Sequence, residues 1–209
     1  GFEIDPSNSH IAGGNKVDLF GFAYPEYVWS DKNFFILSGS PFFTQRETFL
    51  DVGGFEEYIF LYGEDAELSW RYNILGYKLY VNNDTYIHHY GGGVTGFPGP
   101  KWIARTLSSQ LLLMFNCYSF PMLLLILPLY LLYVILILLF LLIKSNFDKE
   151  IIKELLSRLS YMTENIKGIW NFRTEVQKKR VISDWKILKY ISPIPAFLYK
   201  KSWKRVKTK

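Results

Sequence analysis

The chain has 209 residues, enough for one domain or one and a half, and 49% of them are hydrophobic. Its single cysteine, Cys117, excludes a disulfide framework. Residues 1–143 carry 7 Lys and Arg against 13 Asp and Glu, whereas residues 144–209 carry 17 against 6, a net charge of +11. Such a tail behind a long apolar run favours anionic lipid headgroups over nucleic acid as its partner.

The first 30 residues are typical of short strands and loops, with turn-forming pairs such as Asp5-Pro6 and Gly13-Gly14. An apolar run over residues 33–37 predicts a buried strand that ends at Ser38-Gly39-Ser40. The glycine in this turn would let a ligand approach the backbone closely, and an ordinary turn is the alternative.

Two helices are expected next. Thr44-Gln45-Arg46-Glu47 matches a capping box and predicts a short helix to Val52, ended by Gly53-Gly54. The second helix should begin near Glu64. It has Leu68, Tyr72 and Leu75 on one buried face, Glu67 and Arg71 one turn apart, and Gly76 after its end. We then expect strands over residues 77–81 and 85–89, joined by a turn at 82–84.

An uncharged run of 33 residues extends from Leu111 to Ile143. Its last part, residues 121–143, exceeds the roughly 20 residues needed to cross a bilayer. Pro121 and Pro128 each remove a helix hydrogen bond and favour a kink. Three arrangements stay open: one tilted span, a broken re-entrant hairpin, or a helix partly in the membrane interface.

The basic tail contains apolar residues at helical spacing from Ile151 to Ile169, which predicts an amphipathic helix at a membrane surface. The last residues, 197–209, mix aromatic and basic side chains, as is typical of a headgroup layer.

Two groups of residues are candidates for catalysis. The carboxylates of Glu64 and Asp65 would lie at a helix N-terminus, where the helix dipole keeps an acid ionised and able to accept a proton, although they could simply cap the helix. His88 and His89 would point to opposite faces of a strand, so at most one could bind a metal such as Mn²⁺, and a structural role is the alternative. Trp70 could stack on a sugar, although core packing is the other reading.

The order of these motifs resembles the second half of the catalytic domain of family 2 glycosyltransferases, closest to their rhamnosyltransferase-like, membrane-associated branch. The resemblance covers roughly residues 10–95. The matching segments are residues 15–22 (NKVDLFGF), 38–43 (SGSPFF), 52–57 (VGGFEE), 62–71 (YGEDAELSWR), 76–78 (GYK) and 88–92 (HHYGG). Glu56 stands where aspartate is usual in this family, a change from which we expect little consequence.

The resemblance implies an α/β fold, the C-terminal half of a GT-A domain. Residues 1–105 would form the acceptor-side part of this domain, residues 106–143 a membrane-embedded hydrophobic segment, and residues 144–209 a basic amphipathic helical tail at the membrane surface. The family's nucleotide-binding half, with its Asp-x-Asp metal motif, lies N-terminal to this part, and no Asp-x-Asp occurs in the sequence. We therefore expect a fragment that needs a further segment to bind a nucleotide-sugar tightly.

The resemblance also assigns roles. Asp65 would be the general base of an inverting sugar transfer, and Glu64 would orient the acceptor or the base. Ser38, Gly39, Ser40, Trp70 and Arg71 would contact substrate. His89, with His88 as the alternative, would complete a site for a divalent metal, Mn²⁺ or Mg²⁺. This metal would screen the diphosphate leaving group and is expected to need the missing Asp-x-Asp half.

The expected partners are a nucleotide-sugar donor, a glycan or lipid-linked acceptor and anionic membrane lipids, with no nucleic acid. The expected location is the cell membrane, with the catalytic part in the cytoplasm. Because the basic tail should also be cytoplasmic, both ends of the apolar segment would face one compartment. Two other functions stay open: a catalytically inactive membrane-anchored module, and, with fewer visible ligands, a metal hydrolase using Asp65 and His89.

Overall fold

The computed structural model describes residues 2–5, 10–12, 14–26, 36–37, 42–80, 86–88, 99–143, 148–193 and 195. The helices in this part of the chain are α1 (Arg46–Asp51), α2 (Glu64–Ile74), α3 (Pro100–Cys117), α4 (Phe120–Ile143), α5 (Lys149–Glu164), α6 (Ile166–Lys179), α7 (Asp184–Ile187) and the 3₁₀ turn η1 (Leu188–Tyr190). The strands are β1 (Phe2–Asp5), β2 (His10–Ala12), β3 (Gly14–Asp18), β4 (Ala23–Glu26), β5 (Ile36–Leu37), β6 (Tyr86–His88) and β7 (Ile191–Ser192).

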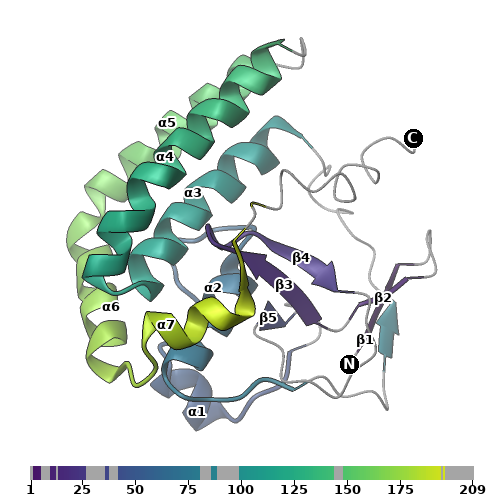
Figure 1. Cartoon of the computed structure of the whole chain (residues 1–209), viewed down its shortest axis with the longest axis vertical. Helices are drawn as coiled ribbons and strands as arrows, with labels where there is room; N and C mark the ends of the chain where they lie inside the picture. The colour runs from purple at the N-terminus through teal and green to yellow at the C-terminus, as the bar shows by residue number, and fades with distance from the viewer. Residues whose placement is uncertain are drawn as a thin grey trace.

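The strands form two small sheets beside a larger helical layer (Figure 1). In one sheet β1 lies between β2, which is antiparallel to it, and β6, which is parallel. In the other sheet β3 pairs with β4 and β5 antiparallel and with β7 parallel. This mostly helical arrangement leaves the expectation of half a GT-A domain as a prediction.

Asp18 closes the hairpin between β3 and β4. The side chain is completely buried, and its Oδ1 accepts hydrogen bonds from the backbone N–H groups of Phe20 and Phe22 at 3.0 and 2.9 Å. Gly21 in this turn has φ +85°, which favours glycine. A segment quoted above for its family resemblance thus has a clear structural role.

The start of α1 differs from the prediction. The helix begins at Arg46 with Gln45 as N-cap and without a side-chain cap. The Thr44 hydroxyl instead lies 3.0 Å from the Tyr72 hydroxyl. The predicted capping box is therefore wrong. The Thr44 hydroxyl does not cap α1 but connects the residues just before α1 to α2. The predicted end is confirmed: Gly53 and Gly54 follow the helix with φ +93° and +65°.

The predicted boundaries of α2 are confirmed. Its C-terminal end is a Schellman motif: the Gly76 N–H donates to the Asn73 carbonyl and the Tyr77 N–H to the Tyr72 carbonyl, with Gly76 at φ +90°. Leu68 and Tyr72 are buried on one face, with Leu75 packed against them, as predicted.

The strands expected after α2 are only partly present. Within residues 77–80 the structure has a single bridge, at Leu79, instead of a strand, so that prediction is wrong there. Tyr77 instead lies at the end of α2, where its ring packs against Tyr72 and its hydroxyl donates a hydrogen bond to Asp51. The strand expected over 85–89 contains β6, and the predicted turn at 82–84 lies outside the described residues.

The apolar run is divided between two helices. α3 ends at Cys117, Tyr118 adopts an extended backbone, and α4 begins at Phe120. The boundary expected after residue 105 falls inside α3. Pro121 is the second residue of α4, where its missing N–H removes no helix hydrogen bond, so the kink expected there is wrong. Pro128 does lie inside the helix.

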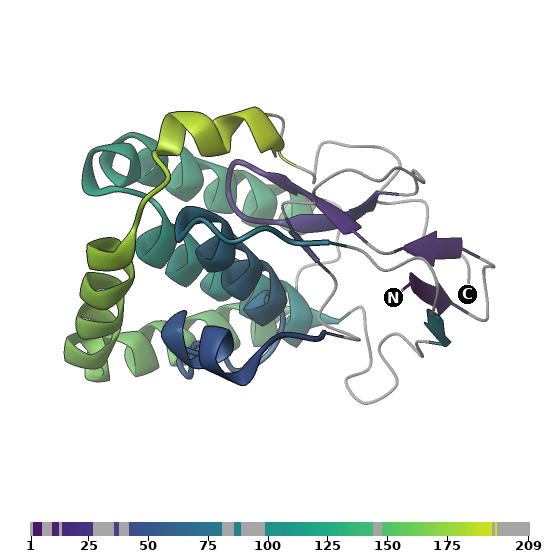
Figure 2. The same cartoon turned by 90° about the horizontal axis from the view of Figure 1, so that it is seen from below.

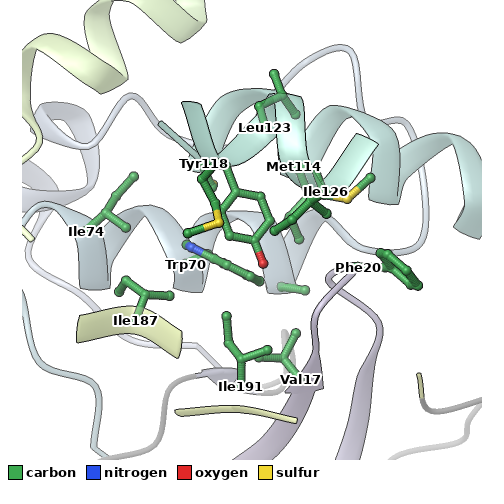
Figure 3. Close-up of a cluster of buried hydrophobic side chains, with 14 of the residues drawn as sticks. Val17, Phe20, Trp70, Ile74, Met114, Tyr118, Leu123, Ile126, Ile187 and Ile191 are labelled. Carbon is green, nitrogen blue, oxygen red and sulfur yellow. The ribbon is translucent and has the colours of Figure 1, made fainter. Parts of the chain in front are cut away.

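The main core joins α2, α3, α4 and the β3 sheet (Figure 3). Trp70 of α2 meets Tyr118 edge to face, with ring centroids 5.2 Å apart. Val17 of β3 and Ile191 of β7 close the cluster from the sheet side. The end of α3 is therefore an interior element of the domain.

The amphipathic tail folds as two helices, α5 and α6, which break at Asn165 and both pack against α3. Ile151, Met162 and Ile169 are buried, as predicted, whereas Leu156 is 61% and Ile166 is 52% exposed. The prediction of one continuous helix is wrong. The chain changes direction at Asn165, and the apolar residues on both sides of this break pack against α3. The aromatic and basic end, 197–209, lies outside the described residues.

Candidate active site at the N-terminus of α2

Glu64 and Asp65 occupy the first turn of α2, both half-buried. The two residues before them, Tyr62 and Gly63, have φ of +69° and +97°. Left-handed backbone at a residue such as tyrosine stores strain of about 1–3 kcal/mol and is characteristic of functional sites. The turn directs the chain so that both carboxylates enter the helix where its dipole is positive.

The two carboxylates have different surroundings. Asp65 Oδ1 accepts a hydrogen bond from the Ala66 N–H at 2.8 Å. Burial, together with the nearby Asp65 charge, raises the pKa of Glu64 above its ordinary value, although backbone N–H groups partly offset this. Glu64 Oε2 is buried and has no hydrogen-bond partner among the described residues.

The glycine loop ahead of the acidic pair is held from inside by Arg71. This guanidinium donates to the carbonyls of Val52 and Gly54, both at 2.6 Å. It also binds Glu67 through two donors at 2.6–2.8 Å, and the Phe172 ring lies 4.9 Å away. The predicted pairing of Glu67 and Arg71 is therefore confirmed, as a fully buried ion pair.

Glu56 and Asn116 extend this ion pair into a network. Asn116 Nδ2 donates to Glu56 Oε2 at 3.0 Å and to Glu67 Oε1 at 3.2 Å, while the Gln177 side chain donates to the Asn116 carbonyl. Glu56 also accepts from the Tyr58 N–H at 3.2 Å. The network ties α2, α3, α6 and the loop before α2 into one rigid support.

Burial raises the pKa of Glu56 to about 7, with a further contribution from the charge of Glu67. Glu56 is only 1% exposed, so its carboxyl cannot be solvated by bulk water. Glu56 is thus a buried part of this support, and the expectation that glutamate in place of aspartate has little consequence stays a prediction. No local feature of the sequence indicates this buried role, because Asn116 is far from Glu56 along the chain.

Two residues expected to contact substrate lie in the interior. Trp70 and Arg71 both have 0% relative exposure, Trp70 in the core with Tyr118 and Arg71 in the ion network. Neither side chain has surface to offer a sugar. The substrate-binding roles predicted for them are thus corrected to structural ones.

The other predicted site residues lie outside the part of the structure that can be described. Ser38, Gly39 and Ser40 follow β5, and His89 follows β6, whose last residue, His88, is described for its backbone only. Their roles stay predictions. In the described residues no three His, Cys, Asp or Glu side chains come together, so these residues alone do not provide the expected metal site.

No family model, curated protein or solved structure matches the chain. The likeness to family 2 glycosyltransferases therefore rests on the sequence motifs, and the activity is a proposal.

Proposed function

We propose that the chain is the acceptor-side part of a membrane-associated inverting glycosyltransferase, which transfers a sugar from a nucleotide-sugar to a glycan or lipid-linked acceptor. The main evidence for the proposal is the half-buried Glu64-Asp65 pair at the start of α2. It follows a strained turn and includes an oxygen without a hydrogen-bond partner among the described residues. The order of motifs around this pair supports the same reaction.

In this reaction Asp65 accepts the proton of an acceptor hydroxyl while that oxygen attacks the anomeric carbon of the sugar. The bond from the anomeric carbon to the diphosphate oxygen breaks on the opposite side, the nucleoside diphosphate leaves, and the configuration inverts. Glu64, the neighbouring residue in the first turn of α2, orients the acceptor or the base. No step here depends on a metal site within the described residues.

The rigid support beneath the pair is suited to this task. A general base must stay within about 3 Å of the proton that it removes, and small displacements are costly in rate. Arg71 fixes the Gly53-Gly54 loop, and the Glu56 network fixes α2 to α3. Trp70 and Arg71 therefore act on catalysis only through the position of α2.

A membrane location fits the composition of α4. Within the described residues it is the one helix that is long and apolar enough to cross a membrane, with a mean hydropathy of 3.1 over its most apolar window. A lipid-linked acceptor would account for this anchor, because both would be confined to one surface. The nucleotide-sugar places the catalytic part on the cytoplasmic side in this proposal.

The proposal is tested with membranes from cells that produce the protein as its gene encodes it. Radiolabelled UDP- and dTDP-sugars are supplied together with Mn²⁺ and a lipid extract of the source cell, and label in lipid or glycan is counted. Wild-type membranes should incorporate one of these sugars. Asp65→Asn should lose at least about 10²–10⁴-fold of the rate, the contribution expected of a general base.

Glu47→Gln is the matched control, because Glu47 is an exposed carboxylate on the neighbouring helix α1. It should retain the wild-type rate. Equal incorporation by Asp65→Asn and wild type would overturn the role of Asp65. Incorporation by none of the membranes would favour the inactive membrane-anchored module.

A further inference from the structure

α4 has one face inside the protein and one outside. The inner face consists of side chains at helical spacing that pack on α3 and the β3–β4 hairpin: Met122, Leu123, Ile126, Tyr130, Ile137 and Leu141. The outer face carries only apolar side chains, each 39–79% exposed: Phe120, Leu124, Leu125, Leu129, Leu131, Leu132, Ile135, Leu136, Leu139, Phe140, Leu142 and Ile143. So large an apolar face marks an interaction surface.

Hydrocarbon matches this face better than another protein does. Protein interfaces mix apolar area with a polar rim, whereas the exposed side chains of α4 contain no nitrogen or oxygen apart from the half-buried Tyr133. The tail that follows has a net charge of +11, complementary to anionic headgroups. At the start of α4, Phe120, Trp170 and Lys178 line an open hollow of about 620 Å³, the mixture found at headgroup level.

The charged residues beside α4 argue against a helix that crosses the bilayer. The Tyr130 hydroxyl donates to the Leu107 carbonyl of α3, which puts Leu107 at the level of the middle of α4. Arg105, two residues along α3, pairs with Glu154 of α5 at 2.8 Å. The two side chains of this ion pair are 20–24% exposed. Because an α-helix rises 1.5 Å per residue, Arg105 lies only about 3 Å along α3 from Leu107 and therefore close to the level of the middle of α4. A perpendicular α4 would carry it to the bilayer centre.

α5 adds exposed charges near the end of α4. Ile151 of α5 shares a hydrophobic cluster with Ile137 and Leu141 of α4, so the two segments lie at the same height. The side chains of Lys153 and Glu150, next to Ile151, are 78% and 50% exposed. Exposed charges at this height are not compatible with the hydrocarbon layer on that side of the molecule.

The hairpin between α3 and α4 does not insert as a re-entrant loop either. Its tip, Tyr118, has 0% exposure and packs on Trp70 inside the main core. The Tyr118 carbonyl accepts a hydrogen bond from Arg173 of α6. The tip is therefore covered by the protein and not available to lipid.

We propose that α4 lies along the surface of one membrane leaflet, with its outer face in the hydrocarbon and both of its ends on the same side of the membrane. Figure 1 shows α4 at the edge of the molecule, away from the sheets, where it can contact a flat surface. In Figure 2 the helices gather on one side of the molecule and the strands on the other. The protein is then anchored without crossing the bilayer, whatever reaction it catalyses.

Depth-dependent quenching tests this arrangement. Cys117 is completely buried, so a fluorophore can be attached to one introduced cysteine at a time. Leu125→Cys, Leu132→Cys and Leu139→Cys are seven residues apart on the outer face, where the native side chains are 48–67% exposed. The labelled proteins are mixed with vesicles of three parts phosphatidylcholine to one part phosphatidylglycerol, with bromine at defined acyl positions.

The proposal predicts the same shallow depth for all three labels. A crossing helix would put Leu132 about 10 Å deeper than at least one of the other two, at 1.5 Å per residue, and that result would overturn the proposal. Thr163→Cys, on an exposed position of α5, is the control and should stay unquenched. No quenching of any α4 label would also overturn it and would point to a second copy of the chain on this face.

A membrane-impermeant maleimide gives an independent measurement. Lys178 lines the hollow at the start of α4, and Lys149 begins the helix that follows its end. In sealed vesicles prepared from cells, Lys178→Cys and Lys149→Cys should react from the same side. Reaction from opposite sides would contradict the proposal.

Discussion

Glu56 should make the protein less stable as the pH rises through neutrality. Its carboxyl is 1% exposed, and burial and the charge of Glu67 raise its pKa to about 7. The carboxyl of an unfolded chain titrates near 4.5. Between these values the folded state keeps the proton that the unfolded state has lost, so the free energy of unfolding decreases with pH.

The size of the effect follows from the two values. Each pKa unit corresponds to about 1.4 kcal/mol, so the change from about 4.5 to about 7 removes about 3 kcal/mol between pH 4.5 and pH 8. All of this stability is present below pH 4.5 and it is lost as the pH passes 7. Glu56→Gln has no proton to lose, so its stability should lack this decrease.

Urea unfolding in detergent micelles, followed by tryptophan fluorescence at pH 5, 6, 7 and 8, measures the difference. The free energy of unfolding of Glu56→Gln relative to wild type should be higher at pH 8 than at pH 5 by up to about 3 kcal/mol. Glu57→Gln, at the exposed neighbouring position, should follow the wild-type curve. Parallel curves for Glu56→Gln and wild type would show that the Glu56 carboxyl does not keep its proton up to neutral pH in the folded protein.

Four further substitutions test the support of the site and the turns at the two ends of α2. Arg71→Met leaves Glu67 buried without its cation and should destabilise the fold by about 3–5 kcal/mol in the same urea assay, while adding Glu67→Met should recover much of this loss. In Gly63→Ala the new Cβ would lie 3.2 Å from Ser109 Cβ, on a backbone with φ +97°. This substitution should lower the free energy of unfolding by about 1–2 kcal/mol and reduce sugar transfer. Unchanged transfer would show that the turn does not position the acidic pair. Gly76→Ala should cost a similar amount in thermal unfolding, because its φ is +90°, but leave transfer unchanged per folded molecule.

Local signals predicted α2 well. Its start at Glu64, its glycine end at Gly76 and the pairing of Glu67 with Arg71 all depend on neighbours within one or two turns. The same reasoning failed for Thr44, because its hydroxyl finds Tyr72 of another helix instead of its own helix end. A capping-box sequence shows only that a side chain is able to cap the helix; whether it does so depends on its tertiary contacts.

The support of the site could not be predicted from the sequence. A glutamate followed one turn later by an arginine occurs on exposed helices and on buried ones. The sequence therefore could not indicate that Arg71 lies in the interior. Glu56 meets Asn116 only because α3 packs on α2, and no periodicity connects them. The apolar run predicted a membrane segment, but only the contacts of α3 divide it into an interior half and an outer helix.

Measuring kcat and KM separately for Asp65→Asn shows whether Asp65 acts as the general base. If Asp65 removes the acceptor proton, kcat should fall at least about 10²-fold with the KM for the nucleotide-sugar and the unfolding midpoint unchanged. A variant with wild-type kcat, or one whose loss of rate follows a loss of folding, would show that Asp65 is not the general base.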